Sequence, residues 1–259
     1  MTATHDLGRF YDESYRRAAA DGDRHLRWRQ LSARGKADHV FALCAAAGLA
    51  PASVAEIGCG DGALLTELGA RGLTGDLYGF EVSEEAARIA RTRGVPGLEG
   101  VTVYDGSRLP APDGAFDLAV LSHVLEHVPD PVGLLREAGR TARSVLVEVP
   151  LEANLSARRG SKRAGAAAIG HLQALDRAAV RAIVEQAGLN VVGDLADPLP
   201  LEVHRFFATS TGQRVRATVK GGARRAAFAL APGAAERLFT LHYACLCGPA
   251  AAPQALRPS

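Results

Sequence analysis

The pattern of hydrophobic and polar positions changes its period near Pro51. Before that point, residues 25–49 place apolar side chains about one helical turn apart, and Gly48 is a typical helix end. After it, short apolar runs alternate with amphipathic segments through most of the chain. The pattern therefore predicts a helical segment over residues 1–50, followed by a domain of alternating strands and helices over residues 51–259.

The apolar runs have the length and the Val, Ile and Leu content of buried strands. They are SVAEI (53–57), LYGFEV (77–82), VTVYD (101–105), FDLAVLS (116–122), SVLVEV (144–149), LNVVGDL (189–195) and LHYACLC (241–247). The intervening helical segments are ALLTELGAR (63–71), SEEAARIARTR (83–93), PVGLLREAGRTA (131–142) and DRAAVRAIVEQAGL (176–189). This alternation predicts an α/β fold in which helices cover both faces of a mostly parallel sheet.

Two Arg-rich segments do not follow the alternation. Residues 152–171 come after the fifth strand, and residues 197–240 lie between the last two strands. We interpret both as insertions that form a cap on the domain.

Composition narrows the class of protein without identifying it. The 259 residues include 47% hydrophobic and 22% charged residues, and the net charge is +2, which does not favour a nucleic-acid binder. The four cysteines are expected to be reduced and buried. Cys245 and Cys247 are separated by one residue, a spacing that suits zinc poorly, so no metal ligand is predicted. The start MTATHDLGRF has no apolar core and no run is long enough to span a bilayer, so we expect a cytoplasmic protein without membrane contact.

The stretch VAEIGCGDGALL (54–65) carries the strongest chemical signal. A strand, a glycine-rich turn and a helix are the arrangement that binds a ligand over a helix N-terminus. Gly58, Gly60 and Ala63 satisfy the dinucleotide fingerprint, and Glu81 lies about twenty residues further on, where an acid can bind a ribose. The glycines alone therefore leave a nicotinamide cofactor and other nucleosides open.

The acidic residues of the loop favour a cationic ligand. Asp61 lies inside the loop and Glu56 before it, and carboxylates this close to a pyrophosphate would repel it. S-adenosylmethionine carries a sulfonium and an ammonium group and no phosphate. Glu56 would favour its cationic part, while Gly62 would let the backbone approach closely. A nicotinamide oxidoreductase is disfavoured for the same reason.

The segment EIGCGDG (56–62) resembles the acid-x-G-x-G-x-G motif of the class I S-adenosylmethionine-dependent methyltransferases. FDLAVLSHVLEHVPDP (116–131) is similar to the type 11 branch that includes the ubiquinone and menaquinone biosynthesis methyltransferases. The resemblance covers about residues 52–195. It implies a Rossmann-like sheet of seven strands in the order 3-2-1-4-5-7-6 with the last strand antiparallel, and the ligand at the carboxyl ends of strands 1 and 4.

The resemblance also implies where the cofactor is bound. Glu81 resembles the family's ribose-binding acid, and Asp105 the residue that pairs with the adenine amino group. In this family the N-terminal helical segment often closes over the cofactor, where Tyr11 would cover the sulfonium; the alternative for Tyr11 is simple packing. The expected contacts are Tyr11, Glu56, Gly58, Cys59, Gly60, Gly62, Glu81, Val82, Asp105, Gly106, Ser107, Ser122 and His123.

Histidines are the candidate bases for a hydroxyl acceptor, which must lose a proton, whereas an amine needs only a neutral lone pair. His123 follows the fourth strand and His171 lies where the first insertion meets the next helix, so both are predicted catalytic residues. His127 is a substrate-binding candidate, with an alternative role in ordering its loop. His204 and His242 are assigned to the surface or to packing.

Arg158 and Arg214 represent the two basic insertions. They suggest an electropositive mouth for a small acceptor that carries a phosphate or carboxylate, although a charged run is often only a solvated face. The sequence thus predicts methyl transfer to oxygen or nitrogen of a small molecule, of the natural-product or sugar-nucleotide type. A nucleic-acid or protein methyltransferase and a catalytically silent binding homologue stay open as alternatives, and so does a homodimer.

Overall fold

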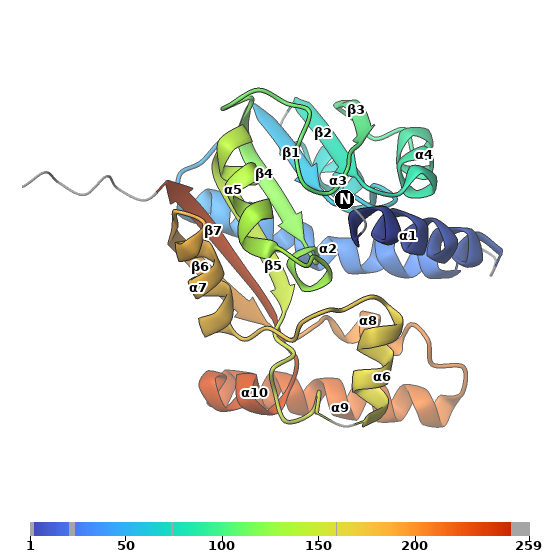
Figure 1. Ribbon diagram of the computed structural model, residues 1–259. Coiled ribbons are helices and arrows are strands. Elements are labelled where there is room, and N and C mark those ends of the chain that lie inside the picture. The colour runs from blue at the N-terminus through green and yellow to red at the C-terminus, as the bar shows by residue number, and fades with distance from the viewer. Residues whose placement is uncertain (1–2, 21–23, 74, 159, 250–259) are drawn as a thin grey trace, which may run out of the picture.

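The computed structural model describes residues 3–20, 24–73, 75–158 and 160–249, and in this part of the chain seven strands form one sheet (Figure 1). The strand order is β3-β2-β1-β4-β5-β7-β6, and β7 runs antiparallel to both β5 and β6. The strands are β1 (Ser53–Ile57), β2 (Asp76–Glu81), β3 (Leu98–Val103), β4 (Phe116–Ser122), β5 (Ala142–Pro150), β6 (Leu189–Asp197) and β7 (His242–Pro249). This arrangement confirms the predicted Rossmann-like class and strand order.

Helices cover both faces of the sheet, because successive strand residues point to opposite faces and both faces are apolar. In β1, Ala55 and Ile57 belong to one buried core, which α5 and α7 cover, while Val54 belongs to the other, beneath α2, α3 and α4. These helices are α2 (Arg24–Ala46), α3 (Ala63–Ala70), α4 (Glu84–Thr92), α5 (Pro131–Thr141) and α7 (Arg177–Gln186). Asp176 caps α7 as the sequence suggests, because its side chain accepts a hydrogen bond from the Ala179 amide.

The predicted insertions form a helical layer beyond the carboxyl ends of β4 and β5 (Figure 1). The first insertion contains α6 (Gly160–Ala168). The second contains α8 (Leu201–Arg205), α9 (Thr211–Leu230) and α10 (Pro232–Leu238). The layer therefore lies at the edge of the sheet where a Rossmann-like fold binds its ligand.

The first helix, α1 (Ala3–Ala20), lies against the amino end of α4. Asp12 fixes it there, because its carboxylate accepts hydrogen bonds from the Ser83 hydroxyl at 2.6 Å and from the Glu85 amide at 3.1 Å. Whether residues 1–50 open and close over the cofactor stays a prediction, and residues 1–2 and 21–23 lie outside the described ones.

All four cysteines are free and buried, as predicted. Of the helices in the described residues, none combines the length and the apolar character that a membrane crossing needs.

Candidate functional site

A cavity of about 1110 Å³ lies where the glycine loop, the N-terminal helices and the carboxyl ends of the central strands meet. It is large enough for a nucleoside cofactor together with a second small molecule. Its walls include most of the predicted site residues: Tyr11, Glu56, Gly58, Cys59, Gly60, Glu81, Val82, Gly106, Ser122, His123, His127 and His171. The lining does not include Gly62, Asp105, Ser107, Arg158 or Arg214.

The glycine loop has a left-handed backbone at Gly58, Gly60 and Gly62, and the last two of these glycines have different roles. Gly60 has φ 56°, and a Cβ added there would lie 2.5 Å from the Tyr15 hydroxyl oxygen, so the loop and α1 approach closely in the cavity wall. Gly62 has φ 76°, and its Cβ would lie 3.1 Å from the Ala90 Cβ. Gly62 therefore lets α3 pack against α4, whereas we expected it to give a ligand access to the backbone.

Glu81 holds the glycine loop against the end of β2. Its carboxylate accepts hydrogen bonds from the Gly60 amide at 2.7 Å and from the Val82 and Ser83 amides at 2.9 Å each. Burial raises the pKa of Glu81, and these three amides partly oppose that rise. The binding of a ribose by Glu81 stays a prediction. The structure shows in addition that Glu81 orders the glycine loop.

The two acids near the loop differ in how they are neutralised. Asp61 forms an ion pair with Arg93 at 2.6 Å, so its charge is already balanced. Burial and the neighbouring carboxylates raise the pKa of Glu56 well above its ordinary value, although Lys36 opposes this. The Oε2 atom of Glu56 is buried and has no hydrogen-bond partner among the described residues. Glu56 is therefore the acid of the loop that a cationic ligand would stabilise.

The segment after β3 forms a tight turn at the rim of the cavity. The Asp105 carboxylate accepts hydrogen bonds from the Ser107 amide and hydroxyl, both at 2.8 Å, and from the Arg108 amide at 3.0 Å. These bonds lower the pKa of Asp105. Gly106, the next residue, lines the cavity. The contact of Asp105 with the adenine amino group stays a prediction, and the structure adds that Asp105 orders this turn.

His123 has an unusual backbone conformation. With φ 58°, it is the one non-glycine residue with a positive φ in the described part of the chain. Such strain persists where surrounding structure requires it and is frequent at functional sites. Burial lowers the pKa of His123, but Glu126, 3.3 Å from Nδ1, and Glu148, 3.8 Å from Nε2, raise it overall.

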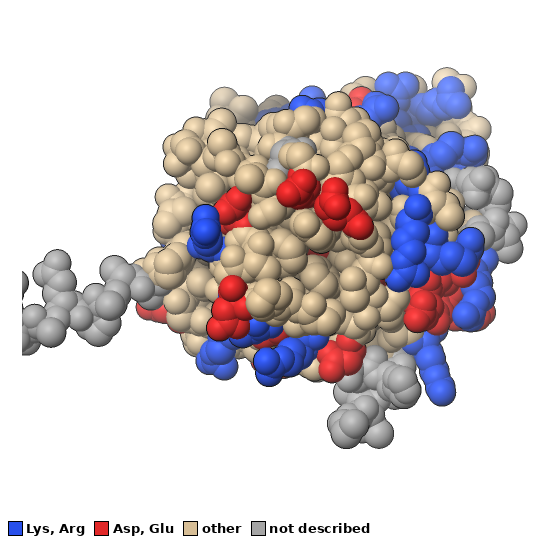
Figure 2. Space-filling model, turned by 90° about the horizontal axis from the view of Figure 1, so that it is seen from above, with Lys and Arg blue, Asp and Glu red and all other residues tan. Residues whose placement is uncertain are grey.

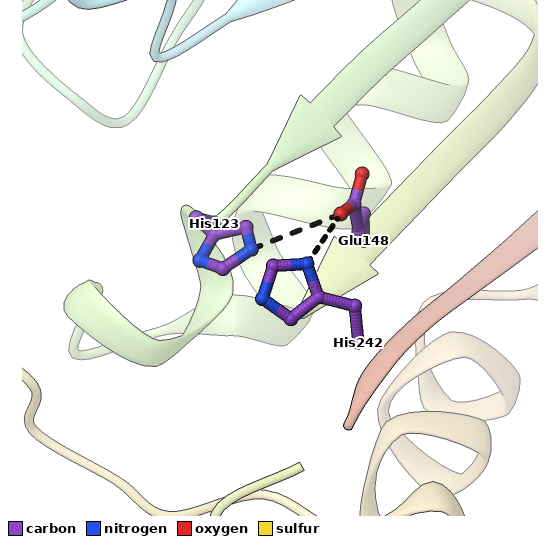
Figure 3. A group of neighbouring side chains, drawn as sticks. All are labelled: His123, Glu148 and His242. Carbon is purple, nitrogen blue, oxygen red and sulfur yellow. Dashed lines mark ion pairs between the residues drawn. The ribbon is translucent and has the colours of Figure 1, made fainter. Parts of the chain in front are cut away.

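Glu148 of β5 is buried and lies among three histidines, of which His39 and His242 are buried and His123 is half-buried; Figure 3 shows His123 and His242 beside it. Its Oε1 lies 3.2 Å from His242 Nδ1, 3.4 Å from His39 Nδ1 and 3.8 Å from His123 Nε2. Burial alone would raise the pKa of Glu148, but the three histidines bring it well below its ordinary value. Of the two alternatives for His242, the surface is excluded because the residue is buried, and since β7 starts at this edge of the sheet it lies in the cavity wall.

A second group of polar side chains lies next to the first, since Glu126 is 3.3 Å from His123 Nδ1 and 3.9 Å from His127 Nε2. The Tyr11 hydroxyl is 2.7 Å from His127 Nδ1, which also lies 3.2 Å from the Gly170 carbonyl oxygen. His171 packs edge-on against His127, and its Nδ1 lies 2.7 Å from a carboxylate oxygen of Glu152. Tyr11, His127 and His171 are thus brought together at one place, which the sequence did not reveal.

The two representative arginines of the insertions are exposed and stand apart from the cavity wall. Lys and Arg also gather elsewhere: Figure 2 shows them toward the side of α1 and α4, around a mostly uncharged centre. A concentration of basic residues is therefore not particular to the insertions. The attraction of an anionic acceptor by Arg158 and Arg214 stays a prediction.

Sequence reasoning missed three residues of the wall, Tyr15, Arg29 and Glu152, and three that lie against the histidines behind it, His39, Glu126 and Glu148. Glu148 and Glu126 could have been found, because each lies at or just after the carboxyl end of a central strand. Tyr15, Arg29 and His39 come from the N-terminal helices, whose position over the sheet has no local signal.

A family model described as a methyltransferase domain matches residues 25–193 of this chain. Ajmaline N-methyltransferase of Rauvolfia serpentina is 32% identical over 98 residues, which are 36% of this chain and 33% of that protein. A ubiquinone biosynthesis O-methyltransferase of Pseudomonas aeruginosa is 32% identical over 103 residues, 38% of this chain and 42% of that protein. The matched segments thus span between a third and about two fifths of these curated relatives.

Solved structures share the fold over nearly the whole chain. The magnesium protoporphyrin IX methyltransferase of Synechocystis PCC 6803, with bound S-adenosylhomocysteine, superposes with a TM-score of 0.59 at 15% sequence identity. The superposition covers 95% of this chain and 99% of that one. At this identity the likeness concerns the fold.

Proposed function

Since the chain belongs to the methyltransferase domain family, we propose that it moves a methyl group from S-adenosylmethionine to an oxygen or nitrogen of a small molecule. Membership confirms the predicted type of enzyme domain and its cofactor, S-adenosylmethionine. The relatives named above include an N- and an O-methyltransferase, which supports both acceptor atoms as candidates. The cavity volume of about 1110 Å³ supports a small acceptor beside the cofactor.

We assign the cationic part of the cofactor to Glu56 and its carboxylate to Arg29. Glu56 presents a buried oxygen without a partner, and Arg29 presents a buried Nη1 without one among the described residues. Both side chains line the cavity. A ligand with an ammonium and a carboxylate group would give each of them a charge-assisted hydrogen bond.

The observation that carries the catalytic assignment is the pair formed by His171 and Glu152. A carboxylate only accepts hydrogen bonds, so the 2.7 Å contact places the proton of the neutral imidazole on Nδ1. Nε2 then keeps its lone pair, which is the form that a general base needs. Both side chains lie in the cavity wall, and Glu152 fixes the tautomer and the ring orientation.

In the proposed reaction, Nε2 of His171 removes the proton of an acceptor hydroxyl. The oxygen forms a bond to the methyl carbon, and the carbon–sulfur bond breaks with its electron pair left on sulfur. The neutral thioether needs no proton, so a base suffices and no general acid is required. An amine acceptor would use the same geometry with its own lone pair, and His171 would then remove the proton after transfer.

The test is His171→Ala, assayed as S-adenosylhomocysteine released with a panel of hydroxyl and amine acceptors. Loss of a general base should lower turnover of a hydroxyl acceptor by about 10²- to 10⁴-fold and leave the affinity for S-adenosylhomocysteine unchanged. Glu152→Gln should lower turnover less, because it perturbs only the tautomer and orientation. His204→Ala, a histidine of α8 that the cavity lining does not include, is the control and should match the unaltered enzyme. Full turnover of a hydroxyl acceptor by His171→Ala would exclude this base.

A further inference from the structure

The group around Glu148 contains an arrangement of atoms that hydrogen bonding does not explain. Glu148 Oε1 faces three ring nitrogens, yet it has no hydrogen-bond partner among the described residues, and neither have His123 Nε2 and both nitrogens of His39. Glu148 is fully buried, and His39 and His242 are nearly so. Buried polar atoms without partners cost about 1–3 kcal/mol each, and more when charged. A ligand bound to both Glu148 Oε1 and His123 Nε2 would remove that cost for these two atoms.

The distances fit a shared metal ion. Metal–ligand bonds of about 2.0–2.1 Å in a tetrahedral site place neighbouring ligand atoms about 3.3–3.4 Å apart. The Glu148 oxygen lies 3.2 Å from His242 Nδ1 and 3.8 Å from His123 Nε2, on either side of that value. All three residues offer ligand atoms within 4.8 Å of one another, and Figure 3 shows both rings turned toward the carboxylate.

The surroundings have the features of the outer shell of a metal site. A metal-bound histidine usually directs its other ring nitrogen to a carboxylate or carbonyl, which fixes its orientation. His123 Nδ1 faces Glu126 at 3.3 Å. The second oxygen of Glu148 accepts a hydrogen bond from the Ser122 hydroxyl at 3.3 Å, and His39 links Glu148 to Asp197 through contacts of 3.4 and 3.3 Å.

The strained backbone of His123 is an independent observation that points to the same place. Its φ of 58° turns the side chain, immediately after β4, toward Glu148 on the neighbouring strand. The positions come from different strands: Glu148 from β5 and His242 from the first residue of β7. The convergence of three ligands from separate parts of the chain therefore does not follow from one local motif.

We infer that His123, Glu148 and His242 form a binding site for a divalent first-row transition metal ion of the zinc type. Two imidazoles and one carboxylate are a ligand set of catalytic zinc sites, which keep a further coordination position open. His123 and His242 line the cavity, so the open position faces the cavity. There the ion would bind an oxygen or nitrogen of the acceptor and stabilise its deprotonated form. Only this last assignment rests on the proposed methyl transfer.

Metal binding is tested on its own with Co²⁺, whose visible absorption reports coordination, in a titration of metal-free protein without acceptor. We expect one Co²⁺ per chain, displaced by Zn²⁺. Glu148→Gln and His242→Ala should each weaken binding by more than about a hundredfold, and His39→Ala, in the outer shell, by about ten- to a hundredfold. His242→Gln, which keeps more of the side-chain volume, supplies the measurement if a variant fails to fold, as judged by circular dichroism and S-adenosylhomocysteine binding.

The control variants are His127→Ala and His171→Ala. With Glu126, these histidines form the other group in the described residues whose spacing suits a metal, and removing either should leave Co²⁺ binding intact. Failure of the unaltered protein to bind Co²⁺, or loss of binding in these controls but not in His242→Ala, would overturn the site. Azide should shift the Co²⁺ spectrum at the open position, and an unchanged spectrum would refute that position. A protein that binds metal but transfers no methyl group would refute the proposed function alone.

Discussion

The contact between Tyr15 of α1 and Gly60 of the glycine loop allows a sharp test of how the N-terminal helix sits on the cofactor site. Tyr15 is buried, and the Arg29 guanidinium lies 4.0 Å from the centre of its ring. A Cβ at Gly60 would lie 2.5 Å from the Tyr15 hydroxyl oxygen but 3.7 Å from Cζ. The clash therefore involves the hydroxyl group and not the ring.

The magnitude follows from two separable costs of Gly60→Ala. A left-handed alanine costs about 1–2 kcal/mol, and forcing a methyl group into a filled space costs about 1–3 kcal/mol. The free energy of unfolding should fall by the sum, about 2–5 kcal/mol. Tyr15→Phe removes the hydroxyl and thus only the second cost. The coupling energy between the two substitutions is therefore predicted to be about 1–3 kcal/mol and favourable.

The assay is a double-mutant cycle measured by urea unfolding, with calorimetry of S-adenosylhomocysteine binding on each variant. Gly60→Ala should weaken binding, and adding Tyr15→Phe should restore stability and part of the affinity. Gly62→Ala is the matched control, because its φ of 76° carries the same backbone cost while its Cβ meets Ala90. A coupling energy below about 0.5 kcal/mol, or an equal coupling with Gly62→Ala, would refute this position of α1.

Three further predictions concern single features. Glu81→Gln exchanges a charged acceptor of three amides for a neutral one, so calorimetry should show S-adenosylhomocysteine binding weakened about ten- to a hundredfold; unchanged affinity would contradict it. Arg140 lowers the pKa of Glu137, so Glu137→Gln should cost about 1 kcal/mol at pH 7. Ionised Glu137 stabilises the folded state fully above the pKa of a carboxyl in the unfolded chain, about 4.3, and this contribution is lost as pH falls through the lower pKa of the folded state. Urea unfolding should therefore show the difference between the two proteins vanish as pH falls below about 4. If Arg158 and Arg214 attract an anionic acceptor, salt and the double alanine variant should both raise its Michaelis constant and spare cofactor affinity; a constant that ignores both would identify a solvated face.

The fold could be predicted because its signals are local and repeated. Each strand is a short apolar run between turn residues, and each helix has its own periodicity and its own end signals. In α7, for example, Asp176 marks the start and Gly188 follows the end. The glycine loop could be predicted for the same reason, since a strand, its turn and the next helix are contiguous. What the sequence could not give is the function of each glycine. The two glycines differ in function only through their neighbours in the fold: Gly62 lies against Ala90 of α4, whereas Gly60 faces Tyr15 of α1.

The polar wall of the cavity was harder to predict because its members come from distant parts of the chain. Tyr11 and His127 are 116 residues apart, and His171 and Glu152 are 19 apart across an insertion without a recognisable pattern. The sequence alone tells only that a histidine can gain or lose a proton near neutral pH. Whether it serves as a base, a ligand or a packing residue depends on which carboxylate lies beside it.

His242 shows that topology can supply part of this information before any coordinates. In a sheet whose last strand is antiparallel, the amino end of that strand lies at the same edge as the carboxyl ends of the parallel strands. The strand order implied by the family resemblance places this antiparallel strand next to β5, so the first residue of β7 had to lie beside the last residues of β5. The register bears this out, since His242 pairs with Pro150 and Ala244 pairs with Glu148. A polar residue that opens an antiparallel strand in such a sheet should therefore be counted among the site candidates, together with those that follow the parallel strands.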